Sequence, residues 1–403
     1  MFSTLSILWN NPGLRACALA IFFFGFSGAA TAPYKSVVAI RELGLSDAAF
    51  SALTLAAAVI NVTAAIYLGI LADRDTGYRK LLMSLAFIGV AGYMAIFLFP
   101  SAWIFVISLL LPISVYHGLN SLLFGAGRVF SSDLPKGDQA AVSSVLRGLI
   151  SLAWILVPGI VGFALSGADS LLPAFAIAGG AALVCMLVIN AMMPRGGSGD
   201  PSQRPPKVSL AAAFRLLTRL PVAARVLGAA VITAMIHVNA AVMPLIVTGQ
   251  AGGEPGDVGV IVGLVAALEV AFILVWARIV RSISIVAALA IGTALYMIYL
   301  VWLAFALSPA SVIAASVVGG IGAAALITLP LGYLQELIAD RPGLSASLIS
   351  VNIFLAGAIA AALFAFGTAI GDYPLVSLLG AGAGALGALG LLALEGWRFR
   401  AAP

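Results

Sequence analysis

The sequence predicts an all-α membrane protein with twelve transmembrane helices, and three observations carry this prediction. Of the 403 residues, 63% are hydrophobic and only 9% are charged, whereas a soluble domain carries roughly 25% charged residues. The mean hydropathy is +1.16. The apolar stretches are continuous and about 20 residues long, the length that a helix needs to cross a bilayer, whereas membrane β-strands alternate apolar and polar residues.

The apolar stretches form two groups of six, which predicts two pseudo-symmetric six-helix halves. The first group lies near residues 14–40, 46–72, 79–99, 102–128, 139–166 and 171–193. The second group lies near residues 222–249, 256–279, 283–306, 310–337, 344–369 and 373–394. We therefore expect an N-terminal half at residues 1–193 and a C-terminal half at residues 222–403. The first stretch is too long for the apolar region of a cleavable signal peptide, so we expect it to be retained as a span.

The residues between the two halves, 194–221, predict a cytoplasmic linker. Most of this segment is rich in Pro, Gly and Ser, a composition that cannot bury a core. Its last part, residues 209–220 with the sequence SLAAAFRLLTRL, predicts a short amphipathic helix on the membrane surface.

The placement of the charges predicts the orientation of the chain. Basic residues gather at one set of alternate helix ends: Arg15, Arg74, Arg79, Lys80, Arg128, Lys136, Arg195, Arg204, Lys207, Arg215, Arg219, Arg225, Arg278, Arg281, Arg341, Arg398 and Arg400. The opposite ends carry the acids Glu42, Asp47, Asp169, Glu254, Asp257 and Asp372, with Arg41 among them as a base. Because basic loops stay in the cytoplasm, we expect a multi-pass protein of the bacterial inner membrane with both termini cytoplasmic.

A weak internal repeat supports the division into two halves. Asp133-Leu-Pro precedes the helix start Ser143-Ser-Val-Leu, and Asp340-Arg-Pro precedes Ser345-Ala-Ser-Leu. Both copies lie between the fourth and fifth apolar stretches of their half. Parallel six-helix repeats about an axis normal to the membrane are typical of one large transporter fold.

The loop after the second stretch has the sequence GILADRDTGYRK. Its notable residues are Gly69, Asp73, Arg74, Gly77, Arg79 and Lys80. The loop resembles the signature loop of the major facilitator superfamily, with one extra residue between Arg74 and Gly77. This resemblance implies that Asp73 pairs with charges and helix ends across the two halves, as a conformational latch. The alternative is a basic cytoplasmic turn with no role in gating.

Six further segments, in four regions of the chain, are similar to the sugar efflux transporter family. They are residues 28–33 with 41–44 (GAATAP and RELG), residues 143–147 with 151–154 (SSVLR and SLAW), residues 267–269 (ALE) and residues 334–337 (LQEL). Lys35 and the order Pro158-Gly159 depart from that family. The resemblance implies proton-coupled efflux of sugars or related small polar solutes by alternating access. Multidrug or metabolite efflux by the same fold, and a non-transporting membrane receptor or scaffold, are the alternatives.

Arg147 and Glu269 are charged residues inside predicted spans, where a charge is costly and usually faces a cavity or a partner. In the facilitator architecture, the fifth and eighth helices are neighbours beside the cavity. We therefore expect Arg147 to pair with Glu269 through bidentate hydrogen bonds. Glu269 is then either a site of proton exchange or half of a static pair that locks the two halves together.

Other polar residues in the spans are candidates for binding the solute. They are Tyr34, Lys35, His117, Asn120, Trp154, His237, Asn239, Gln335 and Asn352. The two histidines could relay protons or simply pack, and Trp154 could stack on a sugar ring or face lipid. Lys35 either extends its amine to the outer interface or is a cavity cation that favours anionic or acidic-sugar substrates.

The sequence contains no Walker loop, metal-ligand cluster or nucleophile triad. We therefore expect no enzymatic activity, cofactor or nucleic-acid partner, and we expect a monomer that interacts with a solute, protons and lipid. Cys17 and Cys185 both fall in apolar stretches, where we expect them to pack as small hydrophobic side chains.

Overall fold

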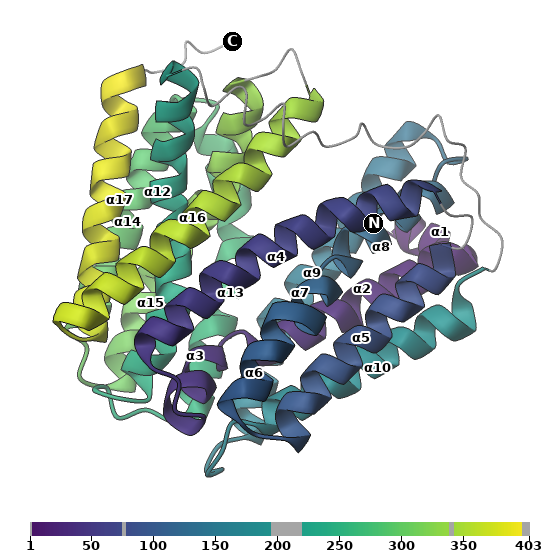
Figure 1. Cartoon of the computed structure of the whole chain (residues 1–403). Helices are drawn as coiled ribbons and strands as arrows, with labels where there is room; N and C mark the ends of the chain where they lie inside the picture. Colours follow the sequence, from purple (N-terminus) through teal and green to yellow (C-terminus); the bar gives the residue numbers. More distant parts are fainter. Residues whose placement is uncertain (1, 75–77, 195–219, 338–341, 397–403) are drawn as a thin grey trace.

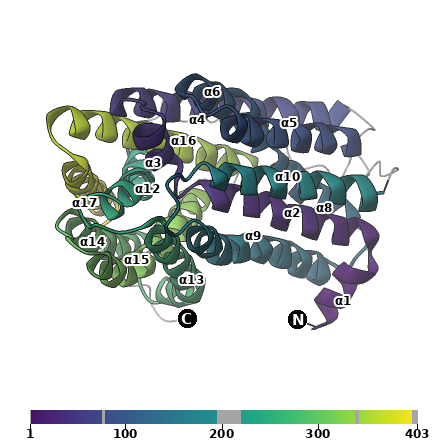
Figure 2. The ribbon, with the colours of Figure 1, turned by 90° about the horizontal axis from the view of Figure 1, so that it is seen from below.

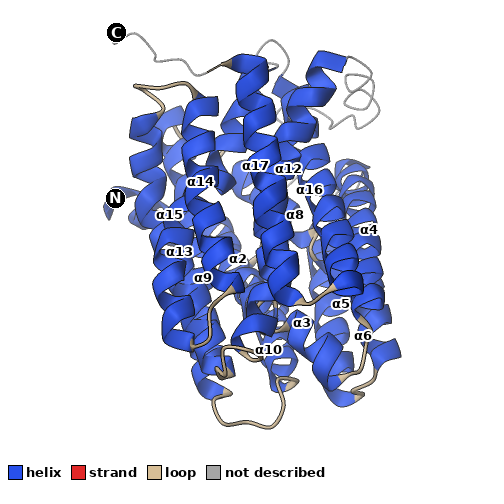
Figure 3. Cartoon of the chain, turned by 90° about the vertical axis from the view of Figure 1, so that its left-hand side faces the viewer, coloured by secondary structure: helices blue, strands red, loops and turns tan. Residues whose placement is uncertain are grey.

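The computed structural model of the chain describes residues 2–74, 78–194, 220–337 and 342–396. The described residues form helices and loops without a strand, and twelve helical spans are long and apolar enough to cross a membrane (Figure 3). The predicted all-α fold with twelve spans is confirmed. The predicted amphipathic helix over residues 209–220 lies outside the described residues, apart from Leu220, at which α12 begins.

The N-terminal half consists of twelve helical segments, which form the first six spans and the short helix before them. They are α1 (Phe2–Asn10), α2 (Pro12–Thr31), α3 (Lys35–Val37), η1 (Val38–Glu42), α4 (Asp47–Arg74), α5 (Tyr78–Leu98), α6 (Ala102–Ser108), η2 (Leu109–Ile113), α7 (Ser114–Tyr116), α8 (Leu119–Phe130), α9 (Lys136–Ala164) and α10 (Pro173–Met192). The short helix α1, which precedes the first span, was not predicted from the sequence.

Each of the last six spans is a single helix. They are α12 (Leu220–Val247), α13 (Pro255–Ile279), α14 (Ile285–Ala304), α15 (Pro309–Leu337), α16 (Pro342–Ile370) and α17 (Tyr373–Glu395). Their bounds agree with the predicted stretches to within a few residues.

Short polar residues set the helix starts. Asn11 precedes α2, and its side-chain oxygen accepts hydrogen bonds from the backbone N–H groups of Gly13 and Leu14 at 3.0 and 3.1 Å. Glu254 and Asp257 form a reciprocal capping box at the start of α13. These side chains satisfy N–H groups that have no partner within the helix.

The first span is interrupted near its outer end. The helix α2 ends at Thr31, residues 32–34 form a turn, and α3 and η1 continue the span to Glu42. Pro33 lies in the turn and lacks the N–H that a continuous α-helix requires. The expectation of one unbroken helix over residues 14–40 is therefore wrong at this point.

The fourth span is also interrupted, where the sequence predicted one helix over residues 102–128. The segment η2 is π-helical and contains Pro112, and residues 117–118 form a turn between α7 and α8. A Cβ on Gly118 would overlap the side chain of Leu68, so the glycine allows α4 to pack closely against this turn. Proline and π-helical segments are frequent causes of such breaks.

The two halves form a V (Figure 1). We call the end of the bundle that contains Met192, Leu220 and Glu395 the terminus end, and the opposite end, which contains Glu42 and Val247, the far end. The halves meet at the far end and diverge toward the terminus end. Seen from below, α12, α14, α15 and α17 of the C-terminal half are nearly end-on, whereas α2, α5 and α10 of the N-terminal half, like α16, lie across the view (Figure 2).

Three helix pairs join the halves: α9 with α13, α4 with α16, and α3 with α12. The α9–α13 crossing depends on glycine. A Cβ on Gly259 would overlap the carbonyl group of Pro158, and a Cβ on Gly162 would lie 2.9 Å from the carbonyl oxygen of Pro255. Glycine at these positions allows the two backbones to approach closely, as is common between membrane helices.

Candidate functional site

Arg41 joins the two halves at the far end. Its guanidinium donates hydrogen bonds to Thr248 Oγ1 at 2.6 Å and to the carbonyl oxygen of Leu245 at 2.7 Å, both near the end of α12. Arg41 is the base that the charge pattern placed among acids, and its two partners explain its position there. It fixes η1 against the C-terminal half.

Other hydrogen bonds link the halves at the same end. Ser166 Oγ donates to Glu254 Oε2 at 2.9 Å, and the Tyr373 hydroxyl donates to Asp47 Oδ1 at 3.1 Å. Ser51, one turn inside α4, donates to a backbone carbonyl of α16. Together with Arg41, we call these the far-end contacts. They hold the vertex of the V closed.

Arg147 and Glu269 lie at the same level of the bundle without touching. The crossing point joins Pro158 to Gly259. From there, Arg147 is eleven residues toward the terminus end and Glu269 is ten, so both are about 15–16 Å along their helices. No ion pair joins them in the described structure, and the Arg147 side chain is exposed. The two charges are not paired in this conformation, and their pairing stays a prediction.

Glu269 lies beside a pair of buried tyrosines in the C-terminal half. It interacts electrostatically with Tyr296, whose ring packs edge-on against Tyr299 with 5.3 Å between centroids. The Tyr299 hydroxyl donates to Asn239 Oδ1 at 2.9 Å. Asn239, a predicted solute-binding residue, therefore links α12 to α14 inside its own half.

The N-terminal half contains a matching tyrosine pair. Tyr93 and Tyr116 pack edge-on with 5.8 Å between ring centroids, and the Tyr116 and Ser27 hydroxyls are hydrogen-bonded at 2.9 Å. Tyr116 directly precedes His117, whose ring lies 6.4 Å from that of Phe24. The sequence analysis did not select these tyrosines, although a tyrosine within an apolar stretch indicates a hydroxyl that must find a partner.

Lys35, His117 and His237 converge from both halves, and we call them the basic cluster. Lys35 begins α3, which packs against α12, the helix that carries His237. Both imidazoles lie within electrostatic range of the Lys35 amine. The side chains of Lys35 and His237 are partly exposed and that of His117 is exposed.

Two predicted amides carry buried oxygens with no hydrogen-bond partner among the described residues. Asn352 is only 1% exposed; its Nδ2 donates to Thr233 Oγ1 at 3.3 Å, and its Oδ1 has no partner. The Oδ1 of Asn120, one turn beyond His117, is also buried and has no partner. A buried polar atom without a partner is costly, so these oxygens are suited to accept hydrogen bonds from water or solute.

The remaining solute-binding candidates lie elsewhere. Tyr34 is fully buried, and its hydroxyl donates to the Pro158 carbonyl at 3.0 Å, so it supports the α9–α13 crossing. Trp154 is partly buried and packs against the apolar core. Gln335 is exposed near the terminus end of α15. Neither Tyr34 nor Gln335 joins the basic cluster.

The predicted gating loop is described only in part. The backbone of Gly69, Asp73 and Arg74 belongs to the end of α4. The side chains of Asp73 and Arg74, and all of Gly77, lie outside the described structure. Arg79 binds the last turn of α10: it donates to the carbonyls of Ile189 and Asn190 and, at 2.8 Å, to Asn190 Oδ1. Lys80 is exposed. A cation at a helix C-terminus is stabilising, and the latch role of Asp73 stays a prediction.

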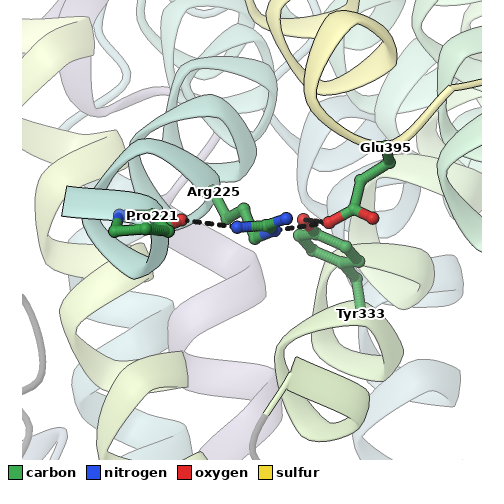
Figure 4. Close-up of polar contacts among 4 residues, drawn as sticks. All are labelled: Pro221, Arg225, Tyr333 and Glu395. Atoms are coloured by element: carbon green, nitrogen blue, oxygen red, sulfur yellow. Dashed lines mark hydrogen bonds and ion pairs between the residues drawn. The ribbon is translucent and has the colours of Figure 1, made fainter. Parts of the chain in front are cut away.

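An ion pair ties three helices of the C-terminal half together at the terminus end (Figure 4). Arg225 of α12 pairs with Glu395 of α17 and donates to the Pro221 carbonyl at 2.9 Å. The Tyr333 hydroxyl of α15 donates to the same Glu395 oxygen at 3.3 Å. All three helices belong to one half, so this group stabilises that half and does not join it to the other.

Two inclined six-helix halves with polar groups between them define a polytopic transporter fold. The sequence profile of the Major Facilitator Superfamily matches residues 17–361, so the chain belongs to this superfamily of transporters. The chain is also similar to a Deinococcus radiodurans protein named "Putative sugar efflux transporter", with 24% identity over 359 residues that cover 87% of this chain and 91% of the relative.

Solved structures share the fold at low sequence identity. The nucleoside transporter NupG matches with a TM-score of 0.79 and 14% identity, over 96% of this chain and 100% of NupG. The peptide transporter POT matches with a TM-score of 0.76 and 15% identity, over 94% of each chain. These likenesses show the fold of the chain. The assignment to a transporter superfamily also means that the protein is not an enzyme.

Proposed function

We propose that the chain exports sugars or related small polar solutes in exchange for protons, by alternating access of its two halves. The superfamily and the similarity to the Deinococcus radiodurans relative support this function. With the terminus end assigned to the cytoplasm from the charge pattern, the V is the conformation open to the cytoplasm. The far-end contacts then close the opposite side of the membrane.

The observation that carries the proposal is the position of Arg147 and Glu269. They lie at similar distances from the crossing at Gly259, and no ion pair joins them among the described residues. Closing the terminus end brings the two helices together and places the guanidinium beside the carboxyl group. The partner of Glu269 therefore changes during the cycle, which is what a carboxyl group needs if it is to bind a proton in one state and release it in the other.

Cysteine cross-linking tests this closure without altering the charged residues. Ser144 lies about one turn before Arg147, Ile273 about one turn after Glu269, and both are exposed. In a variant with Ser144→Cys and Ile273→Cys, we expect a short bifunctional thiol reagent to link the halves, and to do so more under an imposed pH gradient. Absence of the link under every solute and pH condition would argue against closure at this end.

The native cysteines and a matched pair provide the controls. Cys17 and Cys185 are buried, so their background reactivity is low. Ser144→Cys combined with Val260→Cys, an exposed position near the far end of α13, should stay unlinked in both states because the two sites lie at different levels.

A further inference from the structure

The basic cluster places one lysine and two imidazoles between the halves without an acidic partner among the described residues. Lys35 makes no ion pair within the described residues, and neither imidazole makes a side-chain hydrogen bond there. An isolated cation inside a membrane protein is costly and is normally compensated by an anion or by water. The cluster therefore lacks a counter-charge that the chain itself could have supplied.

The acids at the far end are already engaged. Glu42 accepts hydrogen bonds from Ser170 Oγ at 2.6 Å and from the Leu171 N–H at 2.7 Å. Asp47 accepts from Tyr373, and Glu254 accepts from Ser166. These contacts fix the acids at the outer surface of the bundle, so none of them serves Lys35.

Glu269, the acid inside the spans, interacts with a tyrosine of its own half and is not ion-paired with Lys35. Glu269 interacts with Tyr296 of α14, and no ion pair joins it to Lys35. The C-terminal half thus keeps its carboxyl group apart from the basic cluster. No acid of the described residues pairs with Lys35, so the site is suited to an anion from outside the chain.

We propose that the transported solute carries a carboxylate, which binds between Lys35 and the two histidines as a hydroxylated acid such as a hexuronate. This inference rests on the proposed transport function and narrows its substrate class. A carboxylate has two oxygens that accept several hydrogen bonds, and it matches the ammonium group of Lys35 and the N–H groups of the imidazoles. The unpartnered oxygens of Asn120 and Asn352 are suited to accept hydrogen bonds from its hydroxyl groups.

A matched pair of sugars tests the charge preference. D-glucuronate and D-glucose differ in a carboxylate at C6, and each can be offered radiolabelled in counterflow with proteoliposomes of the whole protein. We expect wild type to exchange glucuronate faster than glucose. Lys35→Gln should reduce glucuronate exchange roughly tenfold to a hundredfold, the effect of losing a charge-assisted hydrogen bond, and Lys35→Arg should retain part of it.

The controls separate folding from binding. Lys136→Gln removes an exposed lysine at the start of α9 and should leave exchange unchanged. If Lys35→Gln does not yield a monodisperse protein, His237→Gln tests the same cluster from the other half and should weaken glucuronate exchange without affecting that of glucose.

The outcomes distinguish this inference from the transport function on which it rests. Exchange of glucose but not glucuronate, or glucuronate exchange that Lys35→Gln leaves intact, overturns the anionic site and leaves the transporter in place. No counterflow of either sugar overturns the hexuronate assignment. If a wider panel of neutral sugars, acids and cationic drugs also fails to exchange, the proposed function itself is overturned.

Discussion

Arg41 offers the sharpest test of how the V is held, because it donates two hydrogen bonds across the far end. We expect Arg41→Ala to favour the conformation that is open at this end. Hydrogen bonds to a charged group contribute about 1.5–3 kcal/mol each when buried, but exposed charged pairs contribute only about 0.2–1 kcal/mol. The Arg41 side chain is exposed, so we expect a loss of about 1 kcal/mol in total. That corresponds to about a fivefold change in the ratio of the two conformations.

The distance between spin labels across the far end measures this ratio. Ala168 and Ala310 are exposed, and they lie at the far end of different halves. With labels at both positions, Arg41→Ala should increase the population at long distance. Arg41→Lys should give a smaller increase, because lysine keeps the charge and a donor but lacks the planar fork of the guanidinium. Thr248→Val removes one acceptor and should produce about half of the effect. A distance distribution that Arg41→Ala leaves unchanged would refute this role.

Three further predictions concern stability. Tyr299→Phe removes the hydrogen bond to partly buried Asn239 and should lower the free energy of unfolding in detergent by about 0.5–1.5 kcal/mol; an unchanged midpoint contradicts this. Gly259→Ala should cost about 1–3 kcal/mol through overlap with the facing helix, whereas Gly382→Ala, with open space around it, should not. Arg225→Ala breaks a partly exposed ion pair, so its cost should stay below about 1 kcal/mol, with solute exchange retained; loss of exchange would reveal a role beyond stability.

The sequence predicted the twelve spans correctly because length and hydropathy alone determine whether a helix can cross a bilayer. It did not reveal the breaks in the first and fourth spans. Pro33 and Pro112 were visible, but a proline inside a transmembrane helix often causes only a kink. The break matters, because it places Lys35 at the start of α3 against α12.

The candidate site was predictable only in part. Lys35, His117 and His237 were selected as polar residues inside spans, but their convergence depends on how α3 packs on the C-terminal half. Tyr34 and Asn239 were selected for the same reason, and the structure shows both bonded to protein groups. Whether a polar side chain in a span faces a solute or a neighbouring helix depends on the rotation and packing of its helix, which a single sequence does not specify.

The central claim is that Glu269 couples solute export to proton movement, and a pH-sensitive dye inside proteoliposomes measures that coupling directly. When a solute gradient is imposed, the wild-type protein should move protons across the membrane in the direction opposite to solute flow. Glu269→Gln should still exchange solute in counterflow but move no protons, and Asp169→Asn, at an exposed acid of the far end, should behave as wild type. Proton movement that persists in well-folded Glu269→Gln would contradict the account.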